Sequence, residues 1–133
     1  MTLLLDTHYV FGLAGSPGVL SDREASFLES EPQRFVVSAV SIWEIRLKWR
    51  SVHRSGARKG PASPEDVLKI LSTDAVVEFL ALTVDHAATE LKRPLAYRDP
   101  FDELLLAQAQ AEGLKLLSRD RKLVGHPLVA AVD

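Results

Sequence analysis

The sequence predicts an α/β fold: a three-layer α/β/α domain whose central, mostly parallel sheet has five strands. Short apolar runs without alternating polar residues occur at residues 2–5 and 34–38, as expected for strands that are buried on both faces. Longer segments that begin with helix-capping signals separate such runs. This regular alternation of strands and helices favours a parallel sheet with helices on both faces.

The remaining elements follow from the same patterns. Apolar runs predict strands at residues 75–80 and 115–117, and we expect the tail at 126–132 to supply a fifth. Residues 51–63, which hold two glycines and a proline, predict a loop. Helices are expected at residues 9–14, 21–30, 40–50, from Pro64 onward, 83–92 and 100–112, with a single turn at 120–123.

Several helix ends carry specific signals. Ser21, followed by Glu24 three residues later, is typical of a capping box. Pro64 suits the first position of a helix, and Gly113 suits the position just after the end of one.

Composition narrows the class of protein. We expect one domain spanning residues 1–133, because 133 residues, 47% of them hydrophobic, can bury a core. The absence of cysteine excludes disulfides, thiolate zinc sites and a cysteine nucleophile, and it fits a reducing compartment such as the cytoplasm. No basic segment precedes the first apolar run and Asp6 interrupts that run, so no signal peptide or membrane helix is expected.

Charge is unevenly distributed along the chain. The formal net charge of −2 argues against a protein that binds nucleic acid over its whole surface. Six basic residues and no acidic one lie between residues 46 and 59. Taken alone, this stretch is better explained by cations that are favoured near a helix C-terminus than by contacts with phosphates.

Four carboxylates occur where a strand ends or a helix begins. The carboxyl ends of parallel strands meet at one edge of a sheet, so these side chains are expected to form an acidic pocket. Several carboxylates at close range need a counter-charge, and ligands that are all oxygen favour Mg²⁺ or Mn²⁺. The four acids are Asp6, Glu44, Asp102 and Asp120, and Asp99 lies beside them in sequence.

Each acid also has a structural explanation. Asp99 is placed to cap a helix that begins at residue 100. Glu44 lies three residues after Ser41, which fits a capping box in the first turn of a helix. Asp6 is harder to explain in this way, because a carboxylate that ends an apolar strand is costly to desolvate without a partner. Taken together at the strand ends, the acids favour a shared metal.

Other kinds of site are not favoured. No Gly-rich phosphate loop is present. Thr7 and Ser118 adjoin the acids and are expected to orient carboxylates by hydrogen bonds rather than to act as nucleophiles. The histidines lack the paired spacing of a zinc site; they are His8, His53, His86 and His126.

Four segments, in this order, resemble the PIN-domain family, and within it the VapC-type ribonuclease toxins of type II toxin–antitoxin systems. They are LLLDTH at residues 3–8, SAVSIWEI at 38–45, RDPFDELLLAQA at 98–109 and LSRD at 117–120. The likeness spans nearly the whole chain and falls in a subgroup with the motif Asp-Pro-Phe-Asp. That subgroup often has a histidine before the motif and an arginine after it, whereas Tyr97 and Arg98 precede it here and Glu103 follows.

The resemblance implies a PIN-like sheet of five strands and a metal-dependent endoribonuclease that uses Mg²⁺ or Mn²⁺. It implies that Asp6, Glu44, Asp102 and Asp120 form the catalytic acidic site, with Asp99 as a further metal ligand. It also implies an RNA substrate, a cognate VapB-type antitoxin that blocks the pocket, and a homodimer. Apolar surface for a dimer is expected at Trp43, Trp49 and residues 9–13.

Two alternatives remain. One is a catalytically weak PIN-like module that acts only by binding a protein partner. The other is a metal-dependent phosphatase of doubly wound fold, which residues 6–8 disfavour because they lack an Asp-x-Asp pair.

Overall fold

The sheet has five parallel strands. The computed structural model describes residues 2–30 and 34–132. Neighbouring strands are parallel throughout, and Leu4 of the central strand lies beside Val36 on one side and Leu116 on the other. The predicted α/β fold is therefore confirmed. The spatial order is β3-β2-β1-β4-β5, with bounds β1 (Thr2–Leu5), β2 (Arg34–Ser38), β3 (Val77–Leu80), β4 (Lys115–Leu117) and β5 (Val129–Ala130).

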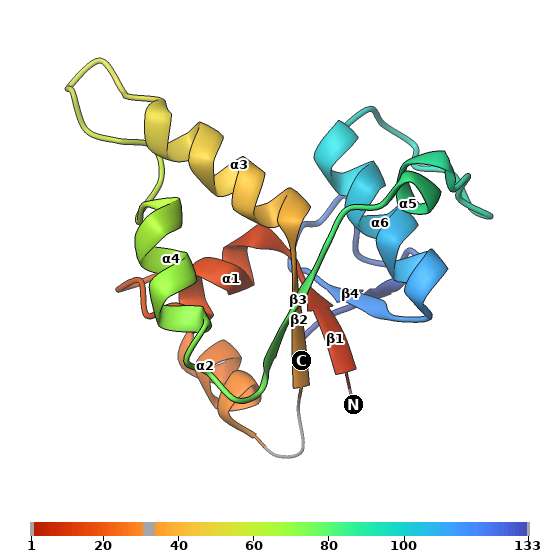
Figure 1. Ribbon diagram of the computed structural model, residues 1–133, viewed down its shortest axis with the longest axis horizontal. Coiled ribbons are helices and arrows are strands. Elements are labelled where there is room, and N and C mark those ends of the chain that lie inside the picture. The colour runs from red at the N-terminus through yellow and green to blue at the C-terminus, as the bar shows by residue number, and fades with distance from the viewer. Residues whose placement is uncertain (1, 31–33, 133) are drawn as a thin grey trace.

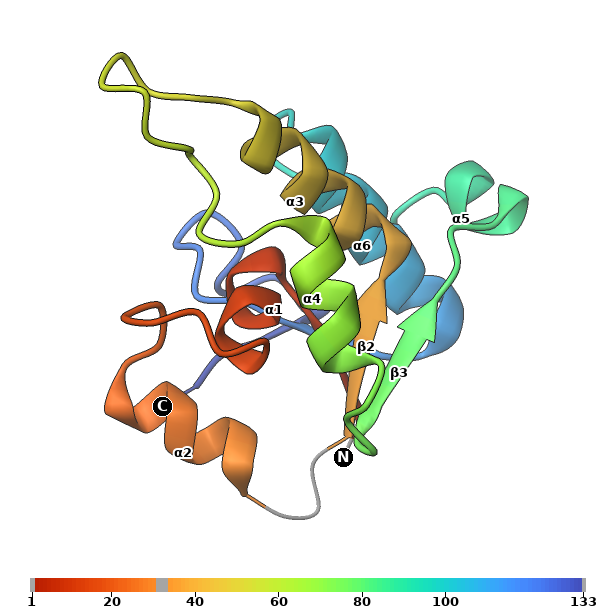
Figure 2. The same ribbon diagram turned by 60° about the vertical axis from the view of Figure 1, so that its left-hand side comes forward.

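Helices cover both faces of this sheet (Figures 1 and 2). Helices α1, α2, α3 and α4 pack on one face, and α6 packs on the other with α5 beside it. This arrangement gives the predicted three layers. The six helices within the described residues are α1 (Thr7–Leu13), α2 (Asp22–Glu29), α3 (Ala39–Arg50), α4 (Pro64–Leu71), α5 (Val84–Ala88) and α6 (Pro100–Glu112).

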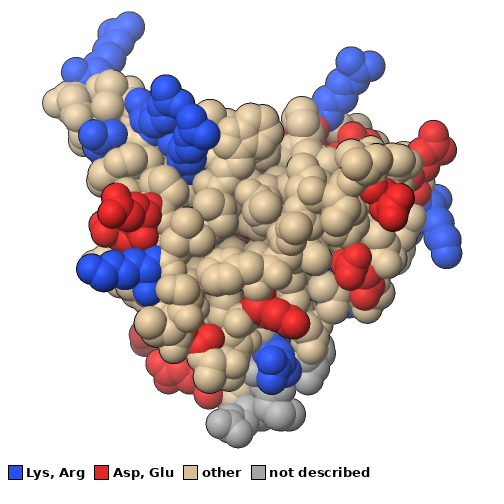
Figure 3. Space-filling view, viewed as in Figure 1, with Lys and Arg blue, Asp and Glu red and all other residues tan. Residues whose placement is uncertain are grey.

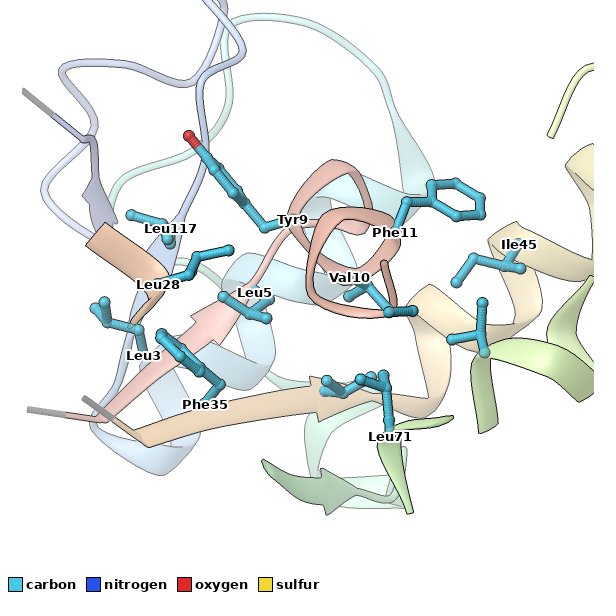
Figure 4. Close-up of a cluster of buried hydrophobic side chains, with 13 residues drawn as sticks. Leu3, Leu5, Tyr9, Val10, Phe11, Leu28, Phe35, Ile45, Leu71 and Leu117 are labelled. Carbon is cyan, nitrogen blue, oxygen red and sulfur yellow. The ribbon is translucent and has the colours of Figure 1, made fainter. Parts of the chain in front are cut away.

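Alternating side chains along the strands build two cores. Leu3, Leu5 and Phe35 pack on the side of α1 and α4 (Figure 4). Leu4 and Val36 point to the opposite face and pack against α6. Full burial of one such side chain contributes roughly 1.5–3 kcal/mol, so a strand that buries both faces must be apolar without interruption.

Helix α5 is shorter than the expected helix at residues 83–92. It ends at Ala88, and the side chain of Gln110 on α6 binds the backbone beyond it. Gln110 Nε2 donates to the carbonyl of Glu90, and Gln110 Oε1 accepts from the backbone N–H of Lys92, both at 2.9 Å. These tertiary hydrogen bonds satisfy backbone groups of residues 90–92 outside a helix, including the Lys92 N–H that a longer helix would have paired.

Two other segments differ in detail from the sequence-based expectation. Residues 120–123 form a hydrogen-bonded turn rather than a helix, and Gly125, with φ 100°, follows this turn. The loop at residues 51–63 contains a short antiparallel bridge between Val52 and Arg58.

The apolar surface expected for a dimer is only partly present. Tyr9, Val10 and Phe11 are at most 4% exposed, because α1 lies between the sheet and α3 and α4, so the expectation for residues 9–13 is wrong. Trp43 is 50% exposed. Trp49 is partly covered by Arg58, which stacks on its ring.

The topology brings several helix and strand ends to one edge of the sheet. The chain leaves the central strand β1 for β2 on one side and later returns as β4 on the other, so a switch point lies between β1 and β4. Helix α3 follows β2 directly, and Gly113 turns α6 straight into β4, so both helices begin at the carboxyl edge. Among residues 2–30 and 34–132, no helix has the length and apolar character that crossing a bilayer requires.

Candidate active site

Asp6 lies at the switch point. It follows β1 directly, and its backbone N–H donates to the carbonyl of Leu117 at the end of β4, at 3.0 Å. Its side chain caps α1, since Oδ1 accepts from the backbone N–H of Thr7 at 2.8 Å. Its other oxygen, Oδ2, accepts from Ser118 Oγ at 2.7 Å. Asp6 is therefore held by the chain on both sides of the switch point.

Ser118 links two of the expected site residues. Its hydroxyl donates to Asp6 and accepts from the backbone N–H of Asp120, at 3.1 Å, and its side chain is fully buried. Asp120 Oδ1 in turn accepts from the backbone N–H of Lys122 at 3.0 Å. The expectation that Ser118 orients a carboxylate is confirmed by these contacts.

Glu44 reaches the site through Thr7. Thr7 Oγ1 donates to Glu44 Oε1 at 2.5 Å and lies 3.3 Å from the hydroxyl oxygen of Ser41. The expected capping box between Ser41 and Glu44 is wrong, because β2 runs directly into α3 and Ser38 is the cap. Glu44 consequently lies in the second turn of α3 rather than the first. Its other oxygen is 3.6 Å from Lys48 Nζ.

Asp99 and Asp102 occupy the start of α6. Asp99 Oδ1 accepts from the backbone N–H groups of Phe101 and Asp102, at 3.0 and 3.1 Å, so Asp99 caps this helix. Asp102 is only 8% exposed, and its Oδ2 accepts from the Tyr97 hydroxyl at 2.8 Å. The helix cap explains Asp99 without a metal, and its role as a ligand stays a prediction.

The acids influence one another's ionisation. Burial raises the pKa of Asp102 to about 6, the hydrogen bond from Tyr97 opposes this rise, and three neighbouring carboxylates, Asp99, Asp6 and Asp120, add to it. Burial also raises the pKa of Asp6, against the hydrogen bonds from Ser118 and Thr7, and the charges of Glu44 and Asp120 raise it further. Carboxylates from β1, α3, α6 and the end of β4 therefore share one electrostatic environment.

The comparison with protein families identifies the chain. The family model of the PIN domain matches residues 3–126, nearly the whole length. This chain belongs to the PIN-domain family. The narrower Asp-Pro-Phe-Asp subgroup and the extent of a single domain over residues 1–133 stay predictions.

Solved structures with the same fold are parts of toxin–antitoxin complexes. VapBC2 of Rickettsia felis, bound to a DNA fragment from its promoter, matches with a TM-score of 0.67 and 17% identity over 100% of both chains. A toxin–antitoxin complex of Klebsiella pneumoniae matches with a TM-score of 0.62 and 18% identity, over 96% of this chain and 95% of that one. FitAcB of Neisseria gonorrhoeae matches with a TM-score of 0.59 and 19% identity, over 100% and 97%. No curated protein sequence matches the chain significantly.

The donor set of this PIN domain fits a hard divalent cation. Its five candidate ligands offer carboxylate oxygens only, and the raised pKa values of Asp6 and Asp102 reflect, in addition to burial, a repulsion that a cation would relieve. Within the described residues, however, no three acidic or histidine side chains lie close enough together to hold one ion. The acids are thus gathered at one edge but not assembled around a single point.

Sequence reasoning missed a second polar cluster of the PIN domain, beside the acids. Glu24 is only 6% exposed and lies 3.5 Å from the guanidinium of Arg119, the neighbour of Asp120. Glu24 is also 3.8 Å from His8 Nε2. Burial lowers the pKa of His8, and the charge of Arg119 lowers it further. The capping box at Ser21 predicted the position of Glu24 on α2. No signal in the sequence predicted its contact with Arg119, which is 95 residues away.

Proposed function

We propose that the protein is a metal-dependent endoribonuclease that acts as the VapC-type toxin of a toxin–antitoxin pair. One observation carries the proposal: four carboxylates from separate elements lie along the sheet edge that holds the switch point of a PIN fold, where neighbouring charges help to raise the pKa of two of them. PIN domains are typically metal-dependent nucleases. The fold neighbours, which are parts of toxin–antitoxin complexes, support the narrower assignment.

In this proposal Asp6, Glu44, Asp102 and Asp120 hold Mg²⁺ or Mn²⁺, with Asp99 as a further candidate ligand. Such an ion supplies Lewis-acid activation of water and stabilises charge on the oxygens of a phosphodiester. The donor set fits this ion, because it contains oxygen ligands only.

The other side chains of the site position these acids. Ser118 and Thr7 donate hydrogen bonds to Asp6 and Glu44, which fixes the carboxylate orientations. Tyr97 donates to Asp102 and favours the ionised form that binds a cation. Without a cation these acids would repel an RNA backbone, so divalent cations should strengthen substrate binding.

We further propose that an antitoxin of the VapB type neutralises the protein. An acidic cleft is complementary to an inserted arginine, whose guanidinium pairs bidentately with carboxylates. We propose a homodimer as well, because Trp43 leaves a large aromatic ring half exposed on α3. An RNA target and such a partner imply a cytoplasmic protein.

The proposal is tested by incubating single-stranded RNA with the protein in Mg²⁺, Mn²⁺ or EDTA. We expect cleavage that needs metal and nearly vanishes in Asp6→Asn. Asp22→Asn is the matched control, because Asp22 is an exposed acid in the first turn of α2. Cleavage in EDTA, or full cleavage by Asp6→Asn, would refute the metal-dependent site.

The absence of an assembled metal site among the described residues favours a second candidate, a catalytically weak PIN-like module that acts through its protein partner. Under this alternative the wild-type protein cleaves no RNA in Mg²⁺ or Mn²⁺ yet still binds its antitoxin. The same assay, with a pull-down of the partner, separates the two functions.

A further inference from the structure

A basic hairpin extends from the end of α3. After Arg50 the chain turns back on itself over residues 51–59, where Val52 and Arg58 form an antiparallel bridge. His53 N–H donates to the carbonyl of Ala57 at 2.8 Å, and Lys59 N–H donates to the carbonyl of Ser51 at 2.9 Å. The segment is therefore a hydrogen-bonded hairpin with a defined shape.

This basic hairpin is seated firmly on α3. The guanidinium of Arg58 lies 4.3 Å from the centre of the Trp49 ring, and its NH1 donates to the Trp49 carbonyl at 2.5 Å. Gly60 is buried against the helix, where an added Cβ would lie 3.2 Å from the Trp49 backbone nitrogen. The orientation of the basic hairpin relative to α3 is thus fixed by packing as well as by hydrogen bonds.

The cations of this region have two different roles. Lys48 is paired with Glu44, and Arg58 is engaged with Trp49. Arg50, Arg54 and Lys59 are exposed and form no ion pair with the residues that the structure describes. Figure 3 shows basic side chains gathered over this end of α3 and the loop after it. Their charges are free to meet a polyanion.

Helix α3 joins this hairpin to the acidic site. Glu44 lies on the same helix, and at 1.5 Å per residue Arg50 is roughly 9 Å further along its axis. The acids at the sheet edge repel a phosphate backbone, so a substrate needs cationic contacts outside them. The basic hairpin, which begins where this helix ends, supplies such contacts.

We propose that the basic hairpin and the end of α3 before it bind the phosphate backbone of the RNA beside the bond that is cleaved, through Arg54 and Lys59 of the hairpin and Arg50 of α3. Arg58 shapes the hairpin and contributes little direct contact. This inference rests on the proposed nuclease function, and it assigns the positioning of the substrate to a surface outside the acidic site. An acidic protein segment is the other possible ligand, and the test below distinguishes it from RNA.

The test compares two triple variants with the same change in charge. One, called the hairpin variant, is Arg50→Gln at the end of α3 with Arg54→Gln and Lys59→Gln in the hairpin. The control is Arg34→Gln, Lys92→Gln and Arg93→Gln, which removes three exposed cations far from the acids, at the amino end of β2 and in the loop after α5. Binding of a labelled single-stranded RNA to the full chain is measured in EDTA at several salt concentrations.

For single-stranded RNA, each phosphate contact makes the plot of log affinity against log salt steeper by about 0.7. The hairpin variant lacks three cations, so its slope should be shallower than that of the wild type by about 2. Between 50 and 200 mM salt the wild type should then lose about 20-fold more affinity than the hairpin variant. The control variant should keep the wild-type slope. Equal slopes for both triple variants would overturn the inference, and so would a polyglutamate peptide that competes as well as RNA.

A second measurement, cleavage of the same RNA in Mn²⁺, separates a failure of the proposed nuclease function from a failure of the proposed role of the hairpin. A wild-type protein that binds RNA through the hairpin but never cleaves it refutes the nuclease and leaves the hairpin as an RNA-binding surface. A hairpin variant with wild-type binding and cleavage refutes the role of the hairpin and leaves the nuclease intact.

Discussion

The hydroxyl of Ser118 lies 2.7 Å from Asp6 Oδ2 and joins the carboxyl ends of two neighbouring strands, although the residues are 112 positions apart in the chain. The same hydroxyl accepts from the backbone of Asp120, so one buried serine fixes two carboxylates of the candidate site. This contact bridges the switch point between β1 and β4, where ligands bind in sheets of this topology.

Replacing this serine should reduce activity more than stability. In Ser118→Ala the Asp6 carboxylate loses a hydrogen bond that favours its charged form, so its pKa should rise further and its affinity for metal should fall. We expect stability to fall by about 1 kcal/mol and metal-dependent cleavage by about 10–100-fold. Chemical denaturation and RNA cleavage at several Mn²⁺ concentrations measure the two effects. Unchanged cleavage would show that Ser118 has only a structural role.

The raised pKa of Asp102 predicts an unusual dependence of stability on pH. The pKa of Asp102 is about 6 in the folded protein, whereas an aspartate in an unfolded chain has a pKa near 3.8. The folded chain therefore binds this proton more tightly than the unfolded chain does. The contribution of Asp102 to the stability of the metal-free protein should therefore fall as pH rises from about 4 to 6. We expect a loss of about 1–3 kcal/mol over this window.

Asp102→Asn isolates this effect, because the variant cannot ionise at this position. Denaturation in EDTA at pH 4.5 and 7 should show that the wild type loses more stability than the variant between the two values. A parallel response of both proteins to pH would contradict the assignment of this titration to Asp102.

The sequence predicted the fold and the positions of the acids at strand ends because these features depend on local patterns. Buried parallel strands must be apolar without interruption, and a carboxylate directly after such a strand is visible in sequence, as with Asp6. The helix predicted at residues 40–50 matches α3 to within one residue, but Ser41 was taken as a cap, whereas β2 passes into the helix without a loop and Ser38 caps it. Glu44 was therefore assigned to the wrong turn.

Contacts made by irregular chain, and contacts between distant segments, could not be predicted. Tyr97 donates to Asp102, five residues later, because the irregular segment just before α6 folds back onto the first turn of that helix, and no periodic pattern specifies this path. The ion pair between Glu24 and Arg119 depends on how α2 packs beside the end of β4. Such pairs are set by tertiary packing, which a single sequence does not record.

Trp43 provides a test of the proposed homodimer. Its ring is 50% exposed, lies 5.7 Å from the ring of Phe101, and is four residues from Leu47, which is 38% exposed on α3. A buried tryptophan at an interface contributes about 2 kcal/mol or more, and both protomers of a symmetric dimer carry the change, so Trp43→Arg should weaken the dimer by more than about 30-fold. Light scattering over a range of concentrations measures this change.

Val84→Arg is the control for the dimer, because Val84 is 85% exposed and far from Trp43 in sequence. It should leave the dimer intact. A wild-type protein that is monomeric at high concentration would refute the dimer, and a dimer that survives Trp43→Arg would place the interface elsewhere.

Asp6→Asn separates a metal ligand from a structural acid. Asparagine keeps the oxygen that accepts from Thr7 and removes a charge that burial and the neighbouring acids make unfavourable. Without metal, the stability of the variant should equal or exceed that of the wild type. Added Mn²⁺ should raise the melting temperature of the wild type and of Asp22→Asn but not that of Asp6→Asn, because only binding to the folded state stabilises it. If Asp6 is structural instead, Asp6→Asn should lose about 1–3 kcal/mol in EDTA and respond to Mn²⁺ as the wild type does.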